Sequence, residues 1–168
     1  YARRASLLCL TTDQETVSAI WDVRSGERMM EIDGHMPGAQ LTTMSSDGAL
    51  LALSDRLSVE IWNTRTGRLQ SRVPARKNYF ITGVEFDDTG GRLVTAGGQL
   101  EPVARVWDTA TGRLIVELRG HTHSINTARF SPDGRLVVTA SQDNSGRIWS
   151  LDDGRELMSL RGHEDMLY

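Results

Sequence analysis

The chain has 168 residues, of which 39% are hydrophobic and 24% charged, a balance typical of a soluble globular protein. No apolar run approaches the roughly 18 residues of a membrane-spanning helix, and a formal net charge of −3 gives no basic field for nucleic acid. We therefore expect neither a membrane nor a nucleic acid as partner. The single cysteine, Cys9, allows no internal disulfide and favours a reducing, cytoplasmic compartment. The 19 basic residues include one lysine, Lys77, and this preference for arginine suggests a bacterial source.

Four tryptophans mark an internal repeat. They are separated by 41, 45 and 42 residues, a period in the range of propeller and solenoid repeats. A glycine follows each tryptophan by five residues, and a Gly-His pair follows three of them, with the histidine fourteen residues on. Landmarks in a fixed order at fixed offsets indicate about four copies of one structural unit across residues 1–168. The tryptophans are Trp21, Trp62, Trp107 and Trp149.

In chain order, the copies differ in completeness. The first has only 20 residues before Trp21, so we expect the chain to start inside a unit. The second has His35 but only a short turn at Asp55 before its tryptophan. The third has Ala75-Arg76 where Gly-His is expected, and residues 97–102 lengthen its turn. A last histidine, His163, opens another unit, so we expect the chain to end inside a unit as well.

The last complete copy displays the predicted strands most clearly. Residues 124–130 have the pattern of a strand, and a Ser-Pro-Asp-Gly turn follows at 131–134. Residues 135–141 are rich in β-branched side chains, which favours a second strand. Third and fourth strands are expected at 147–151 and 156–161, again separated by Asp- and Gly-containing turns. Each copy therefore predicts four short antiparallel strands, and helix signals are weak throughout.

The order of Gly-His, Ser-Pro-Asp-Gly turn, Asp-containing turn and Trp-Asp resembles the WD-repeat family over nearly the whole chain. That resemblance implies an all-β fold of β-propeller blades with four antiparallel strands each, and treats 1–168 as one WD-repeat segment. In the family, the histidine bonds a Ser or Thr of the second strand and the Asp of the following turn, and the tryptophan completes the network. Only the last full blade carries the whole set. Its members are His121, Thr139 (or Ser141 on the same strand face), Asp143 and Trp149.

The other blades are expected to depart from this network. His35 and Trp62 belong to the second blade, whose turn aspartate is displaced. The third blade has Trp107 but no histidine, so we expect the network to be absent there and the blade to be the loosest. Trp21 marks the remaining blade. All these residues are assigned structural roles, because a satisfied polar network rigidifies a thin sheet.

Catalytic and metal-binding hypotheses are weaker. His121, Ser131 and Asp133 could form a hydrolytic triad on paper, but similar turns recur at other blades, and a repeated element is a scaffold element. His121 and His123 form a His-x-His pair with no suggestive third ligand. No phosphate-binding glycine loop is present. The sequence thus predicts no enzyme activity, no cofactor and no metal.

The resemblance also implies where partners would bind. Family members contact partners three and five residues after the histidine and just before the turn aspartate. In this sequence those positions are Ser124, Asn126 and Gln142 in the complete blade, Gly38 and Gln40 after His35, Phe80 and Thr82 in the blade without histidine, and Tyr168 after His163. Phe80 and Tyr168 are the expected anchors, because aromatic residues dominate interface energetics. A competing hypothesis buries Phe80 in its own blade.

The predicted function is a protein–protein interaction scaffold that binds a protein or peptide. The alternative is a sensor or regulatory segment of a larger signalling enzyme, such as a kinase, a caspase-like protease or a nucleotide-hydrolysing switch protein. Three arrangements of about four blades remain open. They are a part of a larger propeller, a ring closed by the segment after His163 against the strands before Trp21, and two copies in an eight-blade ring. Open blade edges would favour self-association.

Overall fold

The computed structural model describes residues 7–11 and 17–162, and all regular elements there are β-strands. The strands form one three-stranded and three four-stranded antiparallel sheets, each built from consecutive segments of the chain. This confirms the predicted all-β class and the antiparallel blades. The described residues contain no helix that could span a membrane.

The sheets follow one another along the sequence. Sheet A contains β1 (Leu7–Thr11), β2 (Val17–Asp22) and β3 (Arg28–Asp33). Sheet B contains β4 (Leu41–Met44), β5 (Leu50–Ser54), β6 (Val59–Asn63) and β7 (Arg68–Val73). Sheet C contains β8 (Ile81–Phe86), β9 (Arg92–Gly97), β10 (Val103–Asp108) and β11 (Leu114–Arg119). Sheet D contains β12 (Ile125–Phe130), β13 (Leu136–Ser141), β14 (Gly146–Ser150) and β15 (Glu156–Leu160), within one residue of every predicted boundary.

Each tryptophan lies on the strand before the last one of its sheet, and each marks the same irregularity. The pairing register to the following strand shifts immediately before Trp21, Trp62, Trp107 and Trp149. Such a bulge increases the local twist of the strand. In every sheet, a glycine with φ between +65° and +73° follows five residues after the tryptophan. Its N–H donates to the carbonyl at the end of the tryptophan strand, so the repeated glycine closes a tight turn that other residues would strain.

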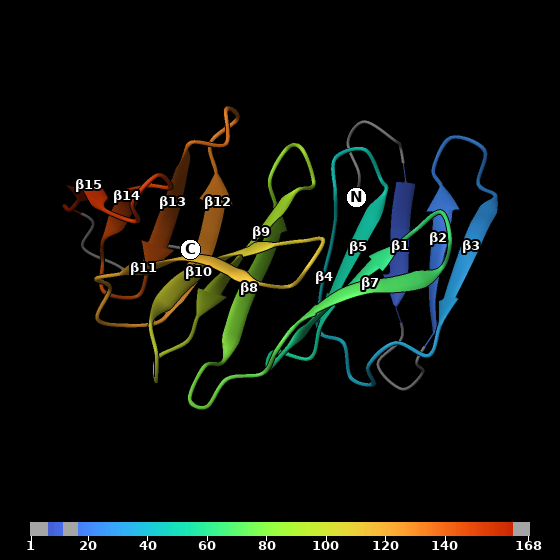
Figure 1. Cartoon of the computed structure of the whole chain (residues 1–168), viewed down its shortest axis with the longest axis horizontal. Helices are drawn as coiled ribbons and strands as arrows, with labels where there is room; N and C mark the ends of the chain where they lie inside the picture. Colours follow the sequence, from blue (N-terminus) through green and yellow to red (C-terminus); the bar gives the residue numbers. More distant parts are fainter. Residues whose placement is uncertain (1–6, 12–16, 163–168) are drawn as a thin grey trace.

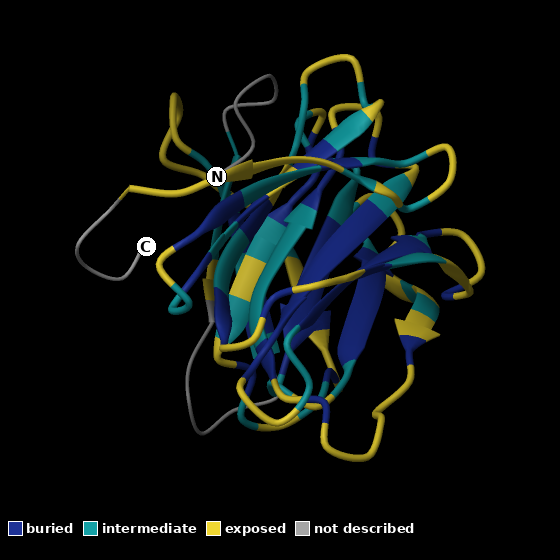
Figure 2. Cartoon of the chain, turned by 90° about the vertical axis from the view of Figure 1, so that its left-hand side faces the viewer, coloured by how far each residue is buried: buried dark blue, intermediate teal, exposed yellow. Residues whose placement is uncertain are grey.

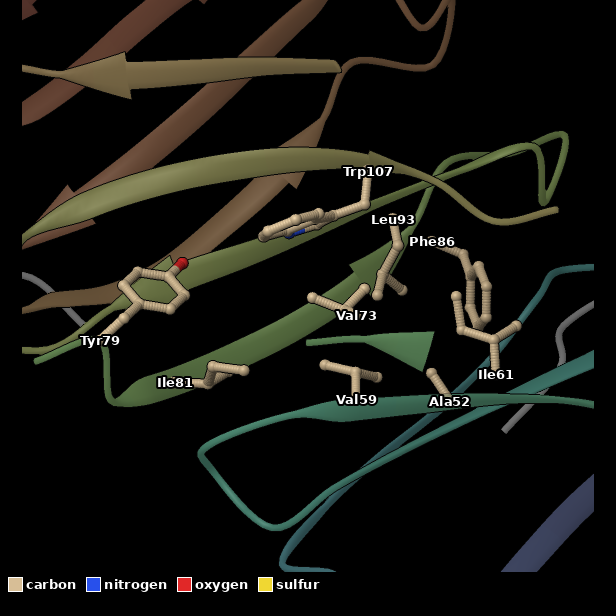
Figure 3. Close-up of a cluster of buried hydrophobic side chains, with 9 residues drawn as sticks. All are labelled: Ala52, Val59, Ile61, Val73, Tyr79, Ile81, Phe86, Leu93 and Trp107. Carbon is tan, nitrogen blue, oxygen red and sulfur yellow. The ribbon is translucent and has the colours of Figure 1, made fainter. Parts of the chain in front are cut away.

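The core consists of three layers of side chains between neighbouring sheets rather than one centre. Figure 3 shows the layer between sheets B and C, where Ala52, Val59 and Ile61 face Leu93 and Trp107. Equivalent clusters lie between sheets A and B and between sheets C and D. Buried residues accordingly fill the interior of the stack in Figure 2, while the loops at its ends are exposed. Each sheet is held mainly by its neighbours, as in repeat proteins.

The four sheets form a row (Figure 1). The first strands of sheets B, C and D lie side by side, with β4 next to β8 and β8 next to β12. Among the described residues, no backbone pairing joins sheet A to sheet D. Within the described residues, sheet A has three strands. The predicted closure by the segment after His163 and the predicted anchor Tyr168 lie outside the described residues.

Candidate functional site

The complete network predicted in sheet D has its members in contact. The Nε2 atom of His121 lies 2.7 Å from Thr139 Oγ1, and its Nδ1 atom lies 2.8 Å from an Asp143 carboxylate oxygen. Trp149 Nε1 donates to the same Thr139 hydroxyl at 2.9 Å. Ser141 is the alternative considered for Thr139, but its hydroxyl donates to backbone carbonyls instead. The four side chains therefore form one hydrogen-bonded chain that joins the connection before β12 and the turn after β13 to strands β13 and β14.

Burial and hydrogen bonds shift the protonation equilibria of this network. Burial lowers the pKa of His121 below 6.5, and the neighbouring Asp143 carboxylate only partly opposes this effect. Burial tends to raise the pKa of Asp143, but hydrogen bonds from Ser145 and His121 outweigh it and hold this pKa far below 3.8. A neutral imidazole beside a carboxylate is thus the resting state at neutral pH.

In sheet C, a tyrosine takes the place of the missing histidine, so the prediction of an absent network is wrong. The Tyr79 hydroxyl lies 2.7 Å from Thr95 Oγ1, and Trp107 Nε1 donates to that oxygen at 2.9 Å. Thr95 stands at the same register position as Thr139, since each pairs with the residue two before the tryptophan. Tyr79, Thr95 and Trp107 are all buried. The sequence did carry a signal, because Tyr79 precedes Trp107 by 28 residues, as His121 precedes Trp149.

A buried arginine, which the sequence did not single out, extends this network. The Arg105 side chain is fully buried, and its guanidinium lies 4.0 Å from the centre of the Tyr79 ring. Arg105 Nε donates to Glu117 at 2.7 Å, and Nη2 donates to Glu101. Hydrogen bonds from Arg105 lower the pKa of Glu117 to about 2 against the opposing effect of its burial. Among the described residues, sheet C therefore has the largest set of ion pairs, and the expectation that it is the loosest blade stays a prediction.

Sheet B replaces the predicted network by a carboxylate. Leu53 pairs with Glu60, two residues before Trp62, and has no hydroxyl to offer that tryptophan. Trp62 Nε1 donates instead to Glu60 at 3.0 Å, and Glu60 also accepts from Arg72. In sheet B the acidic residue, Glu60, is on the tryptophan strand and the basic residue, Arg72, is on the last strand. In sheet C the two charges are exchanged, with Arg105 on the tryptophan strand and Glu117 on the last strand.

His35 is buried, but its partners are not those predicted from the family. Its Nε2 atom lies 2.9 Å from Ser18 Oγ, on β2 of the preceding sheet, and its Nδ1 atom lies 2.8 Å from the Met36 carbonyl. The displaced Asp55 instead caps its own turn at Leu57 and Ser58. His35 therefore ties the connection between β3 and β4 back to sheet A.

Trp21 is the one tryptophan that the described residues leave without a hydrogen-bond acceptor for its buried Nε1 atom. Leu10 pairs with Ala19, two residues before Trp21, and so occupies the position of Thr95 and Thr139. The assignment of Trp21 to a hydrogen-bonded network is therefore wrong, for lack of a hydroxyl at this position.

The residues of the hypothetical hydrolytic triad are separated. His121 precedes β12, whereas Ser131 follows it and donates to Asp133 within its own turn at 2.5 Å. The turns of sheets B and C contain the same kind of bond, from Ser45 to Asp47 and from Thr89 to Asp87. His123 is exposed, and the described residues contain no group of three His, Cys, Asp or Glu side chains suited to a metal ion.

The predicted partner-binding residues gather at one end of the sheets, where β4, β8 and β12 begin. Their register differs in part from the prediction. Leu41, Ile81 and Ile125 are equivalent, because each pairs with the last residue of the following strand. Consequently Gln40, rather than Gly38, corresponds to Phe80 and Ser124, and Thr42 corresponds to Thr82 and Asn126.

These residues differ in their accessibility. Ser124 is buried, and Thr82 donates to the Ile125 carbonyl of the next sheet at 2.5 Å. Gln142 donates to Asn126 at 3.2 Å. Gln40 is exposed, and the Phe80 side chain is 44% exposed, which argues against its burial in its own blade. We call this part of the end the loop surface; it is formed by the exposed residues Gln40, Leu57, Phe80 and Leu100 and the half-buried Arg56.

Comparisons with known proteins identify the repeat. The family model described as "WD domain, G-beta repeat" matches residues 112–150, which include the strands of the complete network. Autophagy-related protein 16 of Arabidopsis thaliana is 25% identical over 82% of this chain. The DENN domain and WD repeat-containing protein SCD1 of the same plant is 30% identical over 75% of the chain. The WD repeat-containing protein SL1-17 of Schistosoma mansoni is 29% identical over 81%.

The matched region covers only part of each relative. It spans 28% of the autophagy-related protein, 10% of the DENN-domain protein and 44% of the Schistosoma protein. All three relatives are eukaryotic.

Proposed function

We propose that this chain is a non-catalytic WD-repeat interaction segment that binds a protein or peptide at the loop surface, since residues 112–150 match the WD-repeat model and two similar proteins are named as WD repeat-containing. The observation that carries this proposal is the gathering of exposed apolar side chains on fixed loops at one end of the sheets. Phe80, Leu57 and Leu100 are 44%, 51% and 77% exposed. Exposed aromatic and aliphatic side chains in one place are typical of binding sites.

The loops that carry these side chains are held by backbone hydrogen bonds. The Phe80 carbonyl accepts from Gly98 at 2.7 Å, and Ile81 N–H donates to the Arg56 carbonyl at 2.7 Å. Three connections from two sheets are thus joined at the loop surface. A surface that is already ordered loses little conformational entropy when a partner binds.

A cytoplasmic location and a bacterial source are part of this proposal. The single cysteine, Cys9, supports the first. The use of arginine in place of lysine supports the second, although the relatives named above are eukaryotic.

Selection of ligands from a displayed peptide library, with the purified chain as bait, tests the proposal. We expect Phe80→Ala and Leu100→Ala to weaken the selected ligands about tenfold or more, as for residues at the centre of an interface. Ile115→Ala is the matched control, because Ile115 is 50% exposed on the outer strand β11. Ligands that bind both loop variants as tightly as the unmodified chain would contradict the proposal, as would a library that yields no ligand.

A further inference from the structure

The loop surface holds an arginine in a backbone conformation that arginine rarely adopts. Arg56 has φ of 72°, and the other non-glycine residues with positive φ among those described are both asparagines, Asn78 and Asn144. Asparagine tolerates the left-handed region through local hydrogen bonds, whereas a long side chain gains nothing there. Strain of this kind persists only where the surroundings impose it, and it gathers at binding sites.

Backbone contacts on both sides impose this conformation. The Arg56 N–H donates to Ser54 Oγ at 3.0 Å, and the Arg56 carbonyl accepts from Ile81 at 2.7 Å. The turn is thereby tied to its own strand β5 and to the first strand of the next sheet.

The guanidinium is held on two sides as well. Its Nε atom donates to Gln40 Oε1 at 2.5 Å, and its central carbon lies 5.5 Å from the centre of the Phe80 ring. Gln40 is itself fixed, since its N–H donates to the Ser54 carbonyl at 2.8 Å. Among the described residues, neither Nη group of Arg56 has a partner. The adjacent carboxylate of Asp55 is engaged in its own turn with Leu57 and Ser58.

We propose that Arg56 is the receptor for a carboxylate of the partner, which presents it next to an apolar side chain. This inference rests on the proposed function and names its partner as an acidic peptide segment. A guanidinium offers two parallel N–H groups to a carboxylate, and here Gln40 and Phe80 orient that fork before binding. Leu57, the next residue in the chain, and Leu100, in the connection between β9 and β10, expose apolar side chains at the same end of the sheets. Lys77, also exposed in the connection that leads to Phe80, adds positive charge for an acidic partner.

The probes are synthetic nonapeptides in which a central Leu, Val or Phe is followed by Asp, and the same peptides with Asn or phosphoserine in place of Asp. The best Asp peptide and its analogues are titrated against the chain by fluorescence anisotropy. We expect the Asp peptide to bind at least tenfold more tightly than its Asn analogue. In Arg56→Asn the two should bind equally, whereas Arg56→Lys should retain only part of the preference because lysine has no planar fork.

Arg56→Asn keeps a residue that tolerates positive φ, so its thermal unfolding should match that of the unmodified chain. Arg65→Asn is the control, because Arg65 is an exposed arginine in the turn after β6, at the other end of sheet B. This variant should keep the full preference for Asp.

Equal binding of the Asp and Asn peptides to the unmodified chain would overturn the inference. It would also be overturned if Arg56→Asn weakened both peptides by the same factor, if only the phosphoserine peptide bound, or if no peptide bound. Peptides that depend on Phe80 but not on their carboxylate would leave the proposed function standing and reject Arg56 as a carboxylate receptor. The peptide selection with Phe80→Ala judges the proposed function separately.

Discussion

Two threonine hydroxyls each join a tryptophan to a different ring. Thr139 accepts from Trp149 and bonds an imidazole, and Thr95 accepts from Trp107 and bonds a phenol. The hydroxyl can serve both rings because it donates one hydrogen bond and accepts two. The threonine–tryptophan pair is therefore common to sheets C and D, and the third member varies with the connection that leads into the sheet.

Removal of the Thr95 hydroxyl tests whether sheet C depends on this pair. We predict that Thr95→Val lowers the free energy of unfolding by about 1–3 kcal/mol, because Trp107 Nε1 is left buried without an acceptor. Thr66→Val, at an exposed turn position, should change it by less than about 0.5 kcal/mol. Urea denaturation measures both. Equal effects of the two variants would show that the Tyr79 network contributes nothing to stability.

The two histidines of the His-x-His pair should behave differently. We predict that His121→Ala costs about 1–3 kcal/mol of unfolding free energy, because Thr139 and Asp143 lose a buried partner. His123→Ala should stay within about ±0.5 kcal/mol, since His123 is exposed. Thermal unfolding with and without zinc is the measurement. A melting temperature that rises with zinc, and no longer does so in either variant, would instead favour a metal site.

The lowered pKa of His121 predicts a loss of stability on mild acidification. Burial keeps the folded imidazole neutral where the unfolded one, with a pKa near 6.5, already binds a proton. The unfolded state therefore binds more protons, and stability falls as the pH drops below about 6.5 towards the folded pKa. Asp143, whose pKa is also lowered, adds its own loss only below about pH 4.

We expect the gap in unfolding free energy between the unmodified chain and His121→Gln to narrow from pH 7.5 to pH 5. His123→Gln should run parallel to the unmodified chain over the same range. Urea denaturation at several pH values measures these curves. A constant gap for His121→Gln would mean that its protonation is not linked to folding.

At the scale of the strands, sequence spacing predicts the residues that recur in every repeat, but it misses positions where one repeat uses a different residue for the same role. The tryptophan and the glycine five residues later identify one strand and one turn of every sheet, because a bulge and a positive φ require them there. Counting forward from Trp62 reaches Arg76 and finds no histidine, although Tyr79 fills the role. Tyr79 lies two residues before the start of β8, whereas His121 lies four residues before the start of β12. The side chains that serve Thr95 and Thr139 are therefore not at equal offsets from the preceding tryptophan.

Other parts of the site depend on contacts that spacing does not encode. His35 stands at the predicted position, but its partner Ser18 belongs to the preceding sheet. The pairing of Gln40, Arg56 and Phe80 joins three connections from two sheets. Such contacts arise from how neighbouring sheets pack, and the sequence of a single repeat does not specify them.

The lack of an acceptor for Trp21 leads to a prediction for sheet A. Leu10 occupies the position of Thr95 and Thr139, so Leu10→Thr places a hydroxyl near Trp21 Nε1. We expect the free energy of unfolding of this variant to exceed that of Leu10→Val by about 1 kcal/mol, the typical net contribution of one hydrogen bond. Valine matches the shape of threonine without the hydroxyl, so the difference isolates the bond. A valine variant as stable as the threonine variant would contradict the prediction.

At the scale of the whole molecule, one face of each sheet is covered by the tryptophan-bearing face of the next. Val94 and Val106, paired across sheet C, are fully buried under sheet D. The equivalent row of sheet D contains Val138, Ile148 and Met158. Its outer members, Val138 and Met158, are 41% and 52% exposed. The opposite end of the row of sheets exposes the tryptophan-bearing face of sheet A, where Leu10 is 53% exposed.

These two uncovered faces have the same character as the faces that pack together inside the chain. We therefore predict that the 168-residue chain associates head to tail, with the Met158 face of one copy against the Leu10 face of another, a heterologous contact. Light scattering should show a molar mass that rises with protein concentration. Met158→Lys and Leu10→Lys should each suppress the rise, because a buried unpaired charge opposes the contact, whereas Ile115→Lys on the outer strand of sheet C should not. Suppression by only one of the two end variants would exclude a head-to-tail contact, and a mass of 18.6 kDa at all concentrations would exclude association through either face.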